Sequence, residues 1–176
     1  KSLEYILLRT AITMMSLADR MSPSPHEDLI SIFLHHVAAT PHQLALQMSH
    51  SALTYQQLHV QVVQWKSFLS QHLETGNVIV CLERTPRLLA VLLALQWLEM
   101  PYIPIDLKTP IKRLRIIIQD SQAKALLLDT YSFFSKTPLG CLQFHLDTVE
   151  LPPFKAPCSH SYQVSPNALA YIIYTS

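Results

Sequence analysis

Apolar positions recur at helical spacing over residues 1–21, and this spacing predicts an amphipathic helix. A cluster of Pro and Ser at residues 22–25 then interrupts the pattern, and such clusters are typical of linkers. We therefore expect two units. Residues 1–22 would form a helix and linker, which fits the tail of a preceding domain, and residues 23–176 would form the main unit.

A capping signal predicts the first helix of the main unit. Ser24 can cap a helix that has Pro25 at its first position and Glu27 in a capping box. This helix would end at Thr40, because the residue before a proline disfavours helical geometry. Its inward side would consist of Leu29, Ile30, Phe33 and Val37.

A second capping box, Thr54 with Gln57, follows a short strand predicted at residues 43–48. The helix that it opens has one apolar stripe at alternating spacings of three and four residues. The stripe consists of Tyr55, Leu58, Val62, Trp65 and Leu69.

Strands and helices alternate from residue 78 onward. Residues 78–82 and 125–128 are apolar on both faces, which is typical of interior strands, and residues 142–146 form a further strand. Residues 102–106 are extended but contain and follow prolines, which exclude a central position in a sheet. This alternation predicts an α/β fold with a parallel-rich sheet flanked by helices.

Two helices connect these strands. Pro86 opens a segment that is apolar nearly all round up to residue 98, so we expect it to be enclosed on most sides. Thr109 and Pro110 open the other, which would carry Lys112, Arg113 and Arg115 toward solvent. The inward residues of this second helix would be Ile111, Leu114, Ile117 and Ile118.

The composition has little charge for its size. Only 14% of the 176 residues are charged and 49% are hydrophobic, whereas an ordinary soluble domain has about 25% charged residues. We therefore expect apolar faces that are covered by residues outside this sequence. The first residue, Lys1, and the abrupt end at Ser176 add to the expectation of an incomplete piece of a longer chain.

Charge and hydropathy exclude two classes of partner. The net charge is +1 with scattered basic residues, so neither a nucleic-acid groove nor a binding face for anionic membranes is indicated. No run of eighteen apolar residues occurs, so we expect no membrane span.

Cysteine, histidine and glycine exclude other sites. Cys81, Cys141 and Cys158 are widely spaced, which argues against a disulfide framework and a zinc site and fits a reducing cytoplasm. The nine His residues form no HExxH pattern, so we expect no metal site. Gly occurs only at Gly76 and Gly140, so the sequence contains no glycine-rich phosphate cradle.

The final stretch, LAYIIYTS at residues 169–176, is typical of a buried strand that runs into a hydroxyl-bearing turn. Open α/β sheets bind ligands at the carboxyl ends of their strands, where Thr175 and Ser176 would lie. On pattern alone, any fully buried strand could have this composition.

Four stretches together resemble the N-terminal half of the amino-acid adenylation domains of nonribosomal peptide synthetases. They are LTYQQL at residues 53–58, CLERTP at residues 81–86, YIPID at residues 102–106 and the final LAYIIYTS. Their order matches that of the family, and the resemblance covers residues 29–176. Between these stretches, four residues fall at the positions of the family's E-R-L and E-D-S motifs: Arg113, Leu114, Asp120 and Ser121.

One departure concerns residues 97–101, where the family usually has K-A-G-x-A before the tyrosine. Here the sequence is Trp-Leu-Glu-Met-Pro, so a backbone position that normally lacks a side chain carries bulk. This difference fits either relaxed constraint or local repacking.

The resemblance implies the N-terminal subdomain of the adenylate-forming, acyl-CoA synthetase-like fold. It implies ATP and Mg²⁺ as cofactors of the complete enzyme, an amino acid as substrate, and a carrier protein and the remainder of the adenylation domain as partners. Thr175 and Ser176 would begin the phosphate-binding loop. Residues for Mg²⁺ and the catalytic lysine would lie beyond this sequence, so we expect this polypeptide alone to be inactive and to need no cofactor.

Two alternatives remain open at this point: a non-catalytic remnant, and a fragment of an acyl-CoA or fatty-acyl-AMP ligase. Glu83 and Arg84 could face a ligand at a strand end or form a structural ion pair. Asp106 is expected to fix a turn or cap a backbone amide.

Overall fold

The computed structural model describes residues 28–48, 51–129, 137–155, 165 and 168–175. The helix predicted over residues 1–21 and the linker after it lie outside this range. The described elements are α2 (Leu29–Ala39), β1 (Leu44–Gln47), β2 (Ala52–Thr54), α3 (Tyr55–His72), β3 (Val78–Cys81), α4 (Pro86–Trp97), β4 (Tyr102–Pro104), α5 (Ile111–Ser121), β5 (Ala125–Leu128) and β6 (Leu142–His145).

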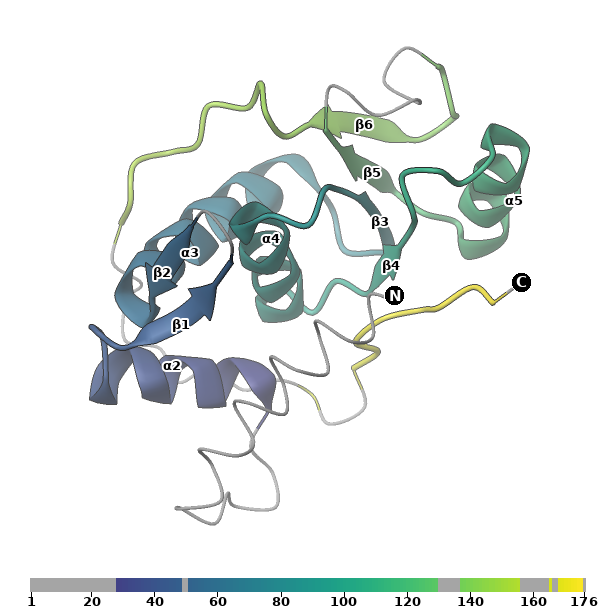
Figure 1. The fold of residues 1–176 in the computed structure, drawn as a ribbon. Coiled ribbons are helices and arrows are strands. Elements are labelled where there is room, and N and C mark those ends of the chain that lie inside the picture. The colour runs from purple at the N-terminus through teal and green to yellow at the C-terminus, as the bar shows by residue number, and fades with distance from the viewer. Residues whose placement is uncertain (1–27, 49–50, 130–136, 156–164, 166–167, 176) are drawn as a thin grey trace.

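A parallel sheet in the order β4-β3-β5-β6 organises the molecule, and β1 and β2 form a separate antiparallel pair (Figure 1). The chain passes from β3 to β4 on one side and then returns to β5 on the other. Because crossover connections are right-handed, this reversal places α4 and α5 on opposite faces of the sheet. The arrangement confirms the predicted α/β fold with a sheet flanked by helices.

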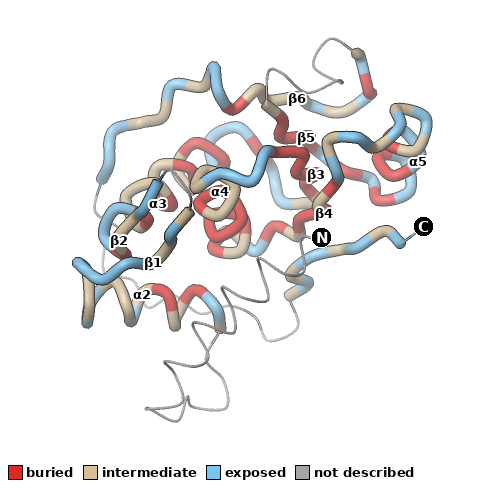
Figure 2. The backbone as a smooth tube through the Cα atoms, viewed as in Figure 1, coloured by how far each residue is buried: buried red, intermediate tan, exposed pale blue. Residues whose placement is uncertain are grey.

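The two faces of the sheet bury separate apolar clusters. On β3, Val78 and Val80 pack with α2, α3 and α4, whereas Ile79 and Cys81 pack with α5. β5 alternates in the same way, and all four of its residues are buried. Figure 2 shows the buried positions concentrated on these central strands and on the helix sides that face them. Interior strands of this kind read as continuous apolar runs, as residues 78–82 and 125–128 do.

The start of α2 differs from the prediction. The helix begins at Leu29, and the carboxylate of Asp28 accepts hydrogen bonds from the backbone N–H groups of Ile30 and Ser31 at 2.9 and 3.0 Å. The predicted cap at Ser24, with Pro25 in the first turn, is therefore wrong, because Asp28 provides a cap directly before the apolar run. Of the residues predicted to face inward, Ile30 and Phe33 are buried, but the prediction is wrong for Leu29, which is 43% exposed at the first position of the helix.

The capping box of α3 is confirmed. Thr54 Oγ1 accepts from the N–H of Gln57, and the Gln57 side chain accepts from the N–H of Thr54. The predicted stripe of this helix is buried throughout: Tyr55, Leu58, Val62, Trp65 and Leu69. None of the helices in the described ranges is long and apolar enough to cross a bilayer.

The departure at residues 97–101 has a structural counterpart. Glu99 has a positive φ of 53°, a left-handed conformation that glycine adopts at lower cost. Its carboxylate accepts a hydrogen bond from the backbone N–H of Ser165 at 2.9 Å. The side chain at this position therefore connects the end of α4 to the approach of the final segment.

Candidate nucleotide-binding edge

The final described segment, residues 168–175, runs parallel to β4 along its outer side. Tyr171 forms a bridge with Tyr102. The N–H of Ile172 donates to the Tyr102 carbonyl at 3.0 Å, and the N–H of Tyr102 donates to the Ala170 carbonyl at 3.4 Å. Since the segment is parallel to β4, Thr175 lies at the sheet edge where the parallel strands end.

The prediction that residues 169–176 form a buried interior strand is wrong for the part that the structure describes. Leu169, Tyr171 and Ile173 are 54%, 51% and 53% exposed. The reason is position: the segment lies outside β4, so alternate side chains project where no described element covers them. The intervening Ile172 and Tyr174 pack against the cluster under α5. Thr175 is exposed, and Ser176 lies outside the described residues.

Side chains from two helices hold this segment. Gln96 of α4 donates from Nε2 to the Ala170 carbonyl at 2.7 Å. Arg113 of α5 donates from Nη2 to the Thr175 carbonyl at 3.2 Å. The Tyr174 hydroxyl donates to Oδ2 of Asp120 at 2.5 Å. The sequence analysis placed Arg113 on the solvent side of the helix and matched Arg113 and Asp120 to family motifs, without a role for either at this edge.

The first turn of α5 brings positive charge to this edge, whereas Asp106 and Asp129 bring negative charge at the ends of β4 and β5. α5 follows β4, so its N-terminus lies at the carboxyl ends of the strands, and its first turn contains no acidic residue. Lys112 and Arg113 lie in that turn, where the partial positive charge of the helix dipole adds to theirs. The hydrogen bond that the Tyr174 hydroxyl donates to Asp120 raises the pKa of Tyr174 above its ordinary value of about 10, so this bond persists through neutral pH.

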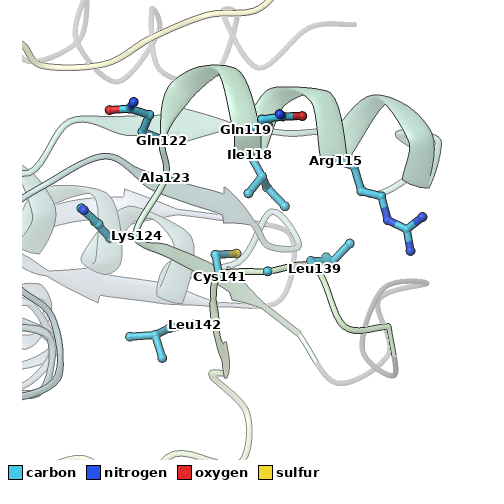
Figure 3. Close-up of a pocket in the computed structure, with 10 residues that line it drawn as sticks. Arg115, Ile118, Gln119, Gln122, Ala123, Lys124, Leu139, Cys141 and Leu142 are labelled. Carbon is cyan, nitrogen blue, oxygen red and sulfur yellow. The ribbon is translucent and has the colours of Figure 1, made fainter.

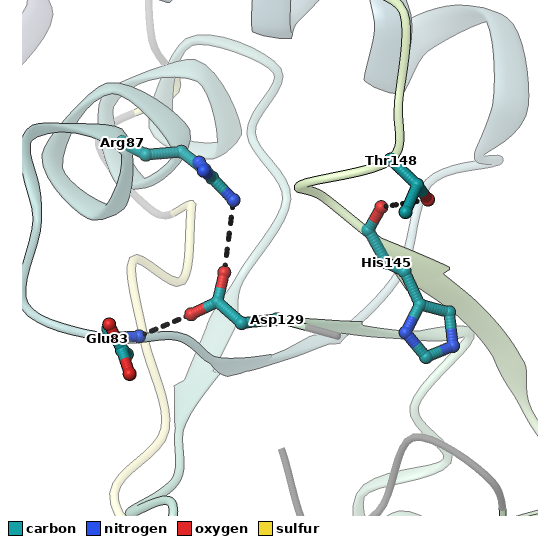
Figure 4. A network of polar contacts seen from close by, with 5 residues as sticks. All are labelled: Glu83, Arg87, Asp129, His145 and Thr148. Carbon is teal, nitrogen blue, oxygen red and sulfur yellow. Dashed lines mark hydrogen bonds and ion pairs between the residues drawn. The ribbon is translucent and has the colours of Figure 1, made fainter. Parts of the chain in front are cut away.

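A polar network lies at the carboxyl ends of β3 and β5 (Figure 4). Asp129 accepts from the backbone N–H of Glu83 at 2.7 Å and forms an ion pair with Arg87 at 3.1 Å. Burial, with smaller contributions from Asp106 and Asp129, raises the pKa of the Cys81 thiol to about 12, so this thiol is not a nucleophile at neutral pH. The bonds from Asp129 to Glu83 and Arg87 connect the end of β5 to the turn that leads into α4.

The expected residues at these strand ends are only partly involved. Glu83 contributes its backbone N–H to the network, and the ion pair is made by Arg87 and Asp129, which the sequence analysis missed. Asp129 could have been identified from the sequence, because it directly follows the buried strand at residues 125–128. Asp106 accepts from the N–H of Lys108 at 2.7 Å, which confirms that it fixes a turn.

An open pocket of about 860 Å³ lies between α5 and the start of β6 (Figure 3). Ile118 extends from the helix toward Cys141 and Leu139, with Lys124 at one end and Arg115 at the other. The pocket is at the amino ends of β5 and β6, the edge opposite Thr175. It therefore does not coincide with the predicted phosphate site. In the described ranges, no three His, Cys, Asp or Glu residues are grouped so that they could hold a metal ion.

The chain matches known proteins over most of its length. Residues 33–176 match the family model of AMP-binding enzymes. A plipastatin synthase polypeptide of Bacillus subtilis (strain 168) is 31% identical over 166 residues, which are 89% of this chain and 6% of that protein. Malpinin synthetase of Mortierella alpina is 32% identical over 152 residues, 82% of this chain and 2% of that protein. The chain thus spans a small part of the curated relatives that it matches.

Solved structures agree in fold. The nonribosomal peptide synthetase FmoA3 in its AMPPNP-bound form has a TM-score of 0.69 at 24% identity, over 88% of this chain and 17% of that one. VinN in complex with 3-methylaspartate has a TM-score of 0.71 at 18% identity, over 86% of this chain and 44% of that one. These comparisons confirm the resemblance to peptide synthetases and the adenylate-forming fold. The chain belongs to the family of AMP-binding enzymes.

Proposed function

We propose that this chain supplies one side of the nucleotide site in an ATP-dependent, amino-acid-activating ligase of the peptide synthetase type. One observation carries the proposal. Residues 168–175 lie parallel to β4 and bring the exposed Thr175 to the carboxyl edge of the sheet, beside the basic first turn of α5. Open α/β sheets bind ligands at this edge.

The proposed reaction joins the carboxylate of an amino acid to the α-phosphorus of ATP and releases pyrophosphate. The thiol of a carrier protein then attacks the acyl carbon, so that a thioester forms and AMP is released. The hydroxyls of Thr175 and Ser176 would donate to phosphate oxygens, and Arg113 would offset charge that develops on them. The phosphate oxygens of ATP are anionic acceptors, and the exposed Thr175 hydroxyl and the basic first turn of α5 are groups that can bind them. The described residues offer no acidic cluster for Mg²⁺, so we assign that ion no step.

The proposal includes partners and location. The remainder of an adenylation domain and a carrier protein would complete the enzyme in the cytoplasm. By the resemblance to the family, the catalytic lysine would lie outside these 176 residues, so we expect the 176-residue chain alone not to form adenylates.

Curated relatives favour the peptide synthetase branch over a CoA ligase. The plipastatin synthase polypeptide and malpinin synthetase are both more than 30% identical to this chain. The O-succinylbenzoate coenzyme A synthetase of Bacillus subtilis shares the fold, with a TM-score of 0.68, at 16% identity. A CoA ligase and a non-catalytic remnant are therefore outcomes that the experiment must distinguish.

A hybrid enzyme tests the proposal. This chain would replace the corresponding residues of the plipastatin synthase adenylation unit, and ATP–pyrophosphate exchange would be measured with a panel of amino acids and with fatty acids. We expect amino-acid-dependent exchange by the hybrid and none by the 176-residue chain alone. In the hybrid, Thr175→Ala and Ser176→Ala should each lower exchange by roughly 10²-fold, the typical effect of losing one transition-state donor.

Thr148→Ala is the matched control. Thr148 is also an exposed hydroxyl residue, at the end of β6, and its hydroxyl donates to the His145 carbonyl at 2.9 Å. Its loss should leave exchange unchanged. Fatty-acid-dependent exchange would support the CoA ligase alternative, and an active hybrid that is insensitive to Thr175→Ala and Ser176→Ala would refute the assigned site.

A further inference from the structure

The segment that carries Thr175 has few backbone contacts. Its described residues are exposed or half-buried, and its hydrogen bonds to β4 involve only Ala170 and Ile172. Among the described residues, no backbone–backbone hydrogen bond is made by residues 173–175. The position of Thr175 therefore depends on side-chain contacts.

Those contacts come from one side of α5. Asp120 accepts from the Tyr174 hydroxyl at 2.5 Å, and Arg113 donates to the Thr175 carbonyl at 3.2 Å. Arg113 and Asp120 are seven residues apart, about two turns of a helix, and therefore lie on the same side. Tyr174 shares its face of the segment with Ile172, and both pack against the cluster under α5.

α5 is itself fixed to the sheet. Leu114 is fully buried, and Ile117 is 2% exposed. At the C-terminal end of the helix, the Ser121 carbonyl accepts from Nδ2 of Asn77 at 2.8 Å, which connects the helix to the residue before β3. The two contacts to the final segment thus start from a helix that is anchored at its middle and at its end.

We propose that Arg113 and Asp120 are positioning residues, a two-point clamp by which α5 sets the location of Thr175 for phosphate binding. The inference rests on the proposed function, since it assigns a role at the same site. The proposed chemistry gives Asp120 no role, and it does not explain why Arg113 donates to the Thr175 carbonyl. The clamp gives both residues a structural role.

The first test uses the 176-residue chain without nucleotide. Hydrogen exchange of the Ile172 amide reports detachment of the segment, and ¹³C NMR of the tyrosine ring reports the pKa of Tyr174. We expect Asp120→Ala to speed exchange roughly five- to tenfold, the effect of one lost hydrogen bond. The same variant should return the pKa of Tyr174 toward its ordinary value of about 10.

Asp120→Asn separates positioning from general destabilisation. The amide retains an acceptor at the same place, so protection of Ile172 should persist, while loss of the negative charge should lower the pKa of Tyr174. The clamp is refuted if the pKa of Tyr174 stays raised in Asp120→Ala. It is equally refuted if Asn and Ala variants lose the same protection.

Arg113 is tested against a charge-matched neighbour. We expect Arg113→Ala to bring the order parameter of the Thr175 amide below about 0.6, and Arg113→Lys to restore part of it. Arg115→Ala removes the same charge from the pocket side of α5 and should leave Thr175 unchanged. An equal effect of Arg115→Ala, or none from Arg113→Ala, would overturn the assignment.

These readouts involve no ATP, so their failure would remove the clamp and leave the proposed function intact. Conversely, an inactive hybrid would count against the proposed function and leave the clamp intact. In an active hybrid, Asp120→Ala should raise the KM for ATP about tenfold and Asp120→Asn should restore it. An unchanged KM in both variants would contradict a positioning role.

Discussion

His59 has a buried ring nitrogen, Nε2, that has no hydrogen-bond partner in the described structure. The ring stacks on Trp97 with centroids 6.1 Å apart, and Phe33 lies at 6.2 Å. Burial lowers the pKa of His59 below its ordinary value of 6.5. Protonation therefore favours the unfolded chain.

The sign of the pH effect follows. Because the pKa of His59 is lower in the folded chain, its contribution to stability is fully present above about pH 6.5 and is lost as the pH falls toward the folded-state pKa. We expect His59→Leu to reduce the loss of unfolding free energy between pH 6.5 and 5, as measured by urea denaturation. Part of the slope should remain, because burial also lowers the pKa of His36. Exposed His42 provides the control: if His42→Leu flattens the profile equally, the assignment to His59 is wrong.

Glu99 illustrates what single residues reveal in advance. The sequence located it as a bulky residue where the family has none, and the structure gives it a left-handed φ of 53°. The bond from the Ser165 N–H to its carboxylate could not be foreseen, because the two residues are 66 positions apart. An unusual backbone conformation at one residue can thus be predicted from the sequence, whereas its hydrogen-bond partner in a distant part of the chain cannot.

At the scale of elements, α5 has distinct inner and outer sides. Leu114 is fully buried against the sheet, and Ile116 is 65% exposed on the same helix. We expect Leu114→Ala to lower the free energy of unfolding by about 2–5 kcal/mol. Ile116→Ala should change it by less than about 0.5 kcal/mol. Chemical denaturation of the two variants would measure this, and similar losses in both would contradict the assigned faces.

The elements were predicted best where one pattern decides them. Apolar runs located β3 and β5, and the Thr54–Gln57 capping box located the start of α3. The start of α2 was misjudged because the capping box of Ser24 and Glu27 was followed, although Asp28 directly precedes the first residue of the apolar side, Leu29.

The candidate site was less predictable for a physical reason. The run at residues 169–176 is apolar on both sides, which fits either a central strand or a segment at the margin of a sheet. Its neighbours in space decide between these, and they come from α4, β4 and α5. The hydroxyl of Thr175 was expected at the carboxyl edge because residues 169–176 resemble a strand that ends in a hydroxyl-bearing turn. The hydrogen bonds from Arg113 to the Thr175 carbonyl and from Tyr174 to Asp120 depend on tertiary structure and could not be expected.

At the scale of the whole molecule, the outer side of the final segment is apolar and exposed. Leu169, Tyr171 and Ile173 project from the margin of the sheet, and exposed apolar sheet edges promote self-association. We expect Ile173→Lys to reduce concentration-dependent association of the 176-residue chain several-fold in sedimentation velocity. Leu44→Lys adds the same charge at an exposed apolar position on β1, which belongs to the separate antiparallel pair. If both substitutions reduce association equally, overall charge and not this margin is responsible for it.

The two central strands present apolar side chains to both layers of the molecule, and this has a consequence for alignment. Sliding β5 past β3 by one residue would exchange one set of buried side chains for another, so burial alone does not select their register. Polar groups at the strand ends do. The Asn77 side chain donates from Nδ2 to the Ser121 carbonyl at 2.8 Å at one end, and the Asp129 carboxylate accepts from the Glu83 N–H at 2.7 Å at the other. Substitution of one apolar residue for another within β3 or β5 should therefore be tolerated as long as these hydrogen bonds at the strand ends are retained.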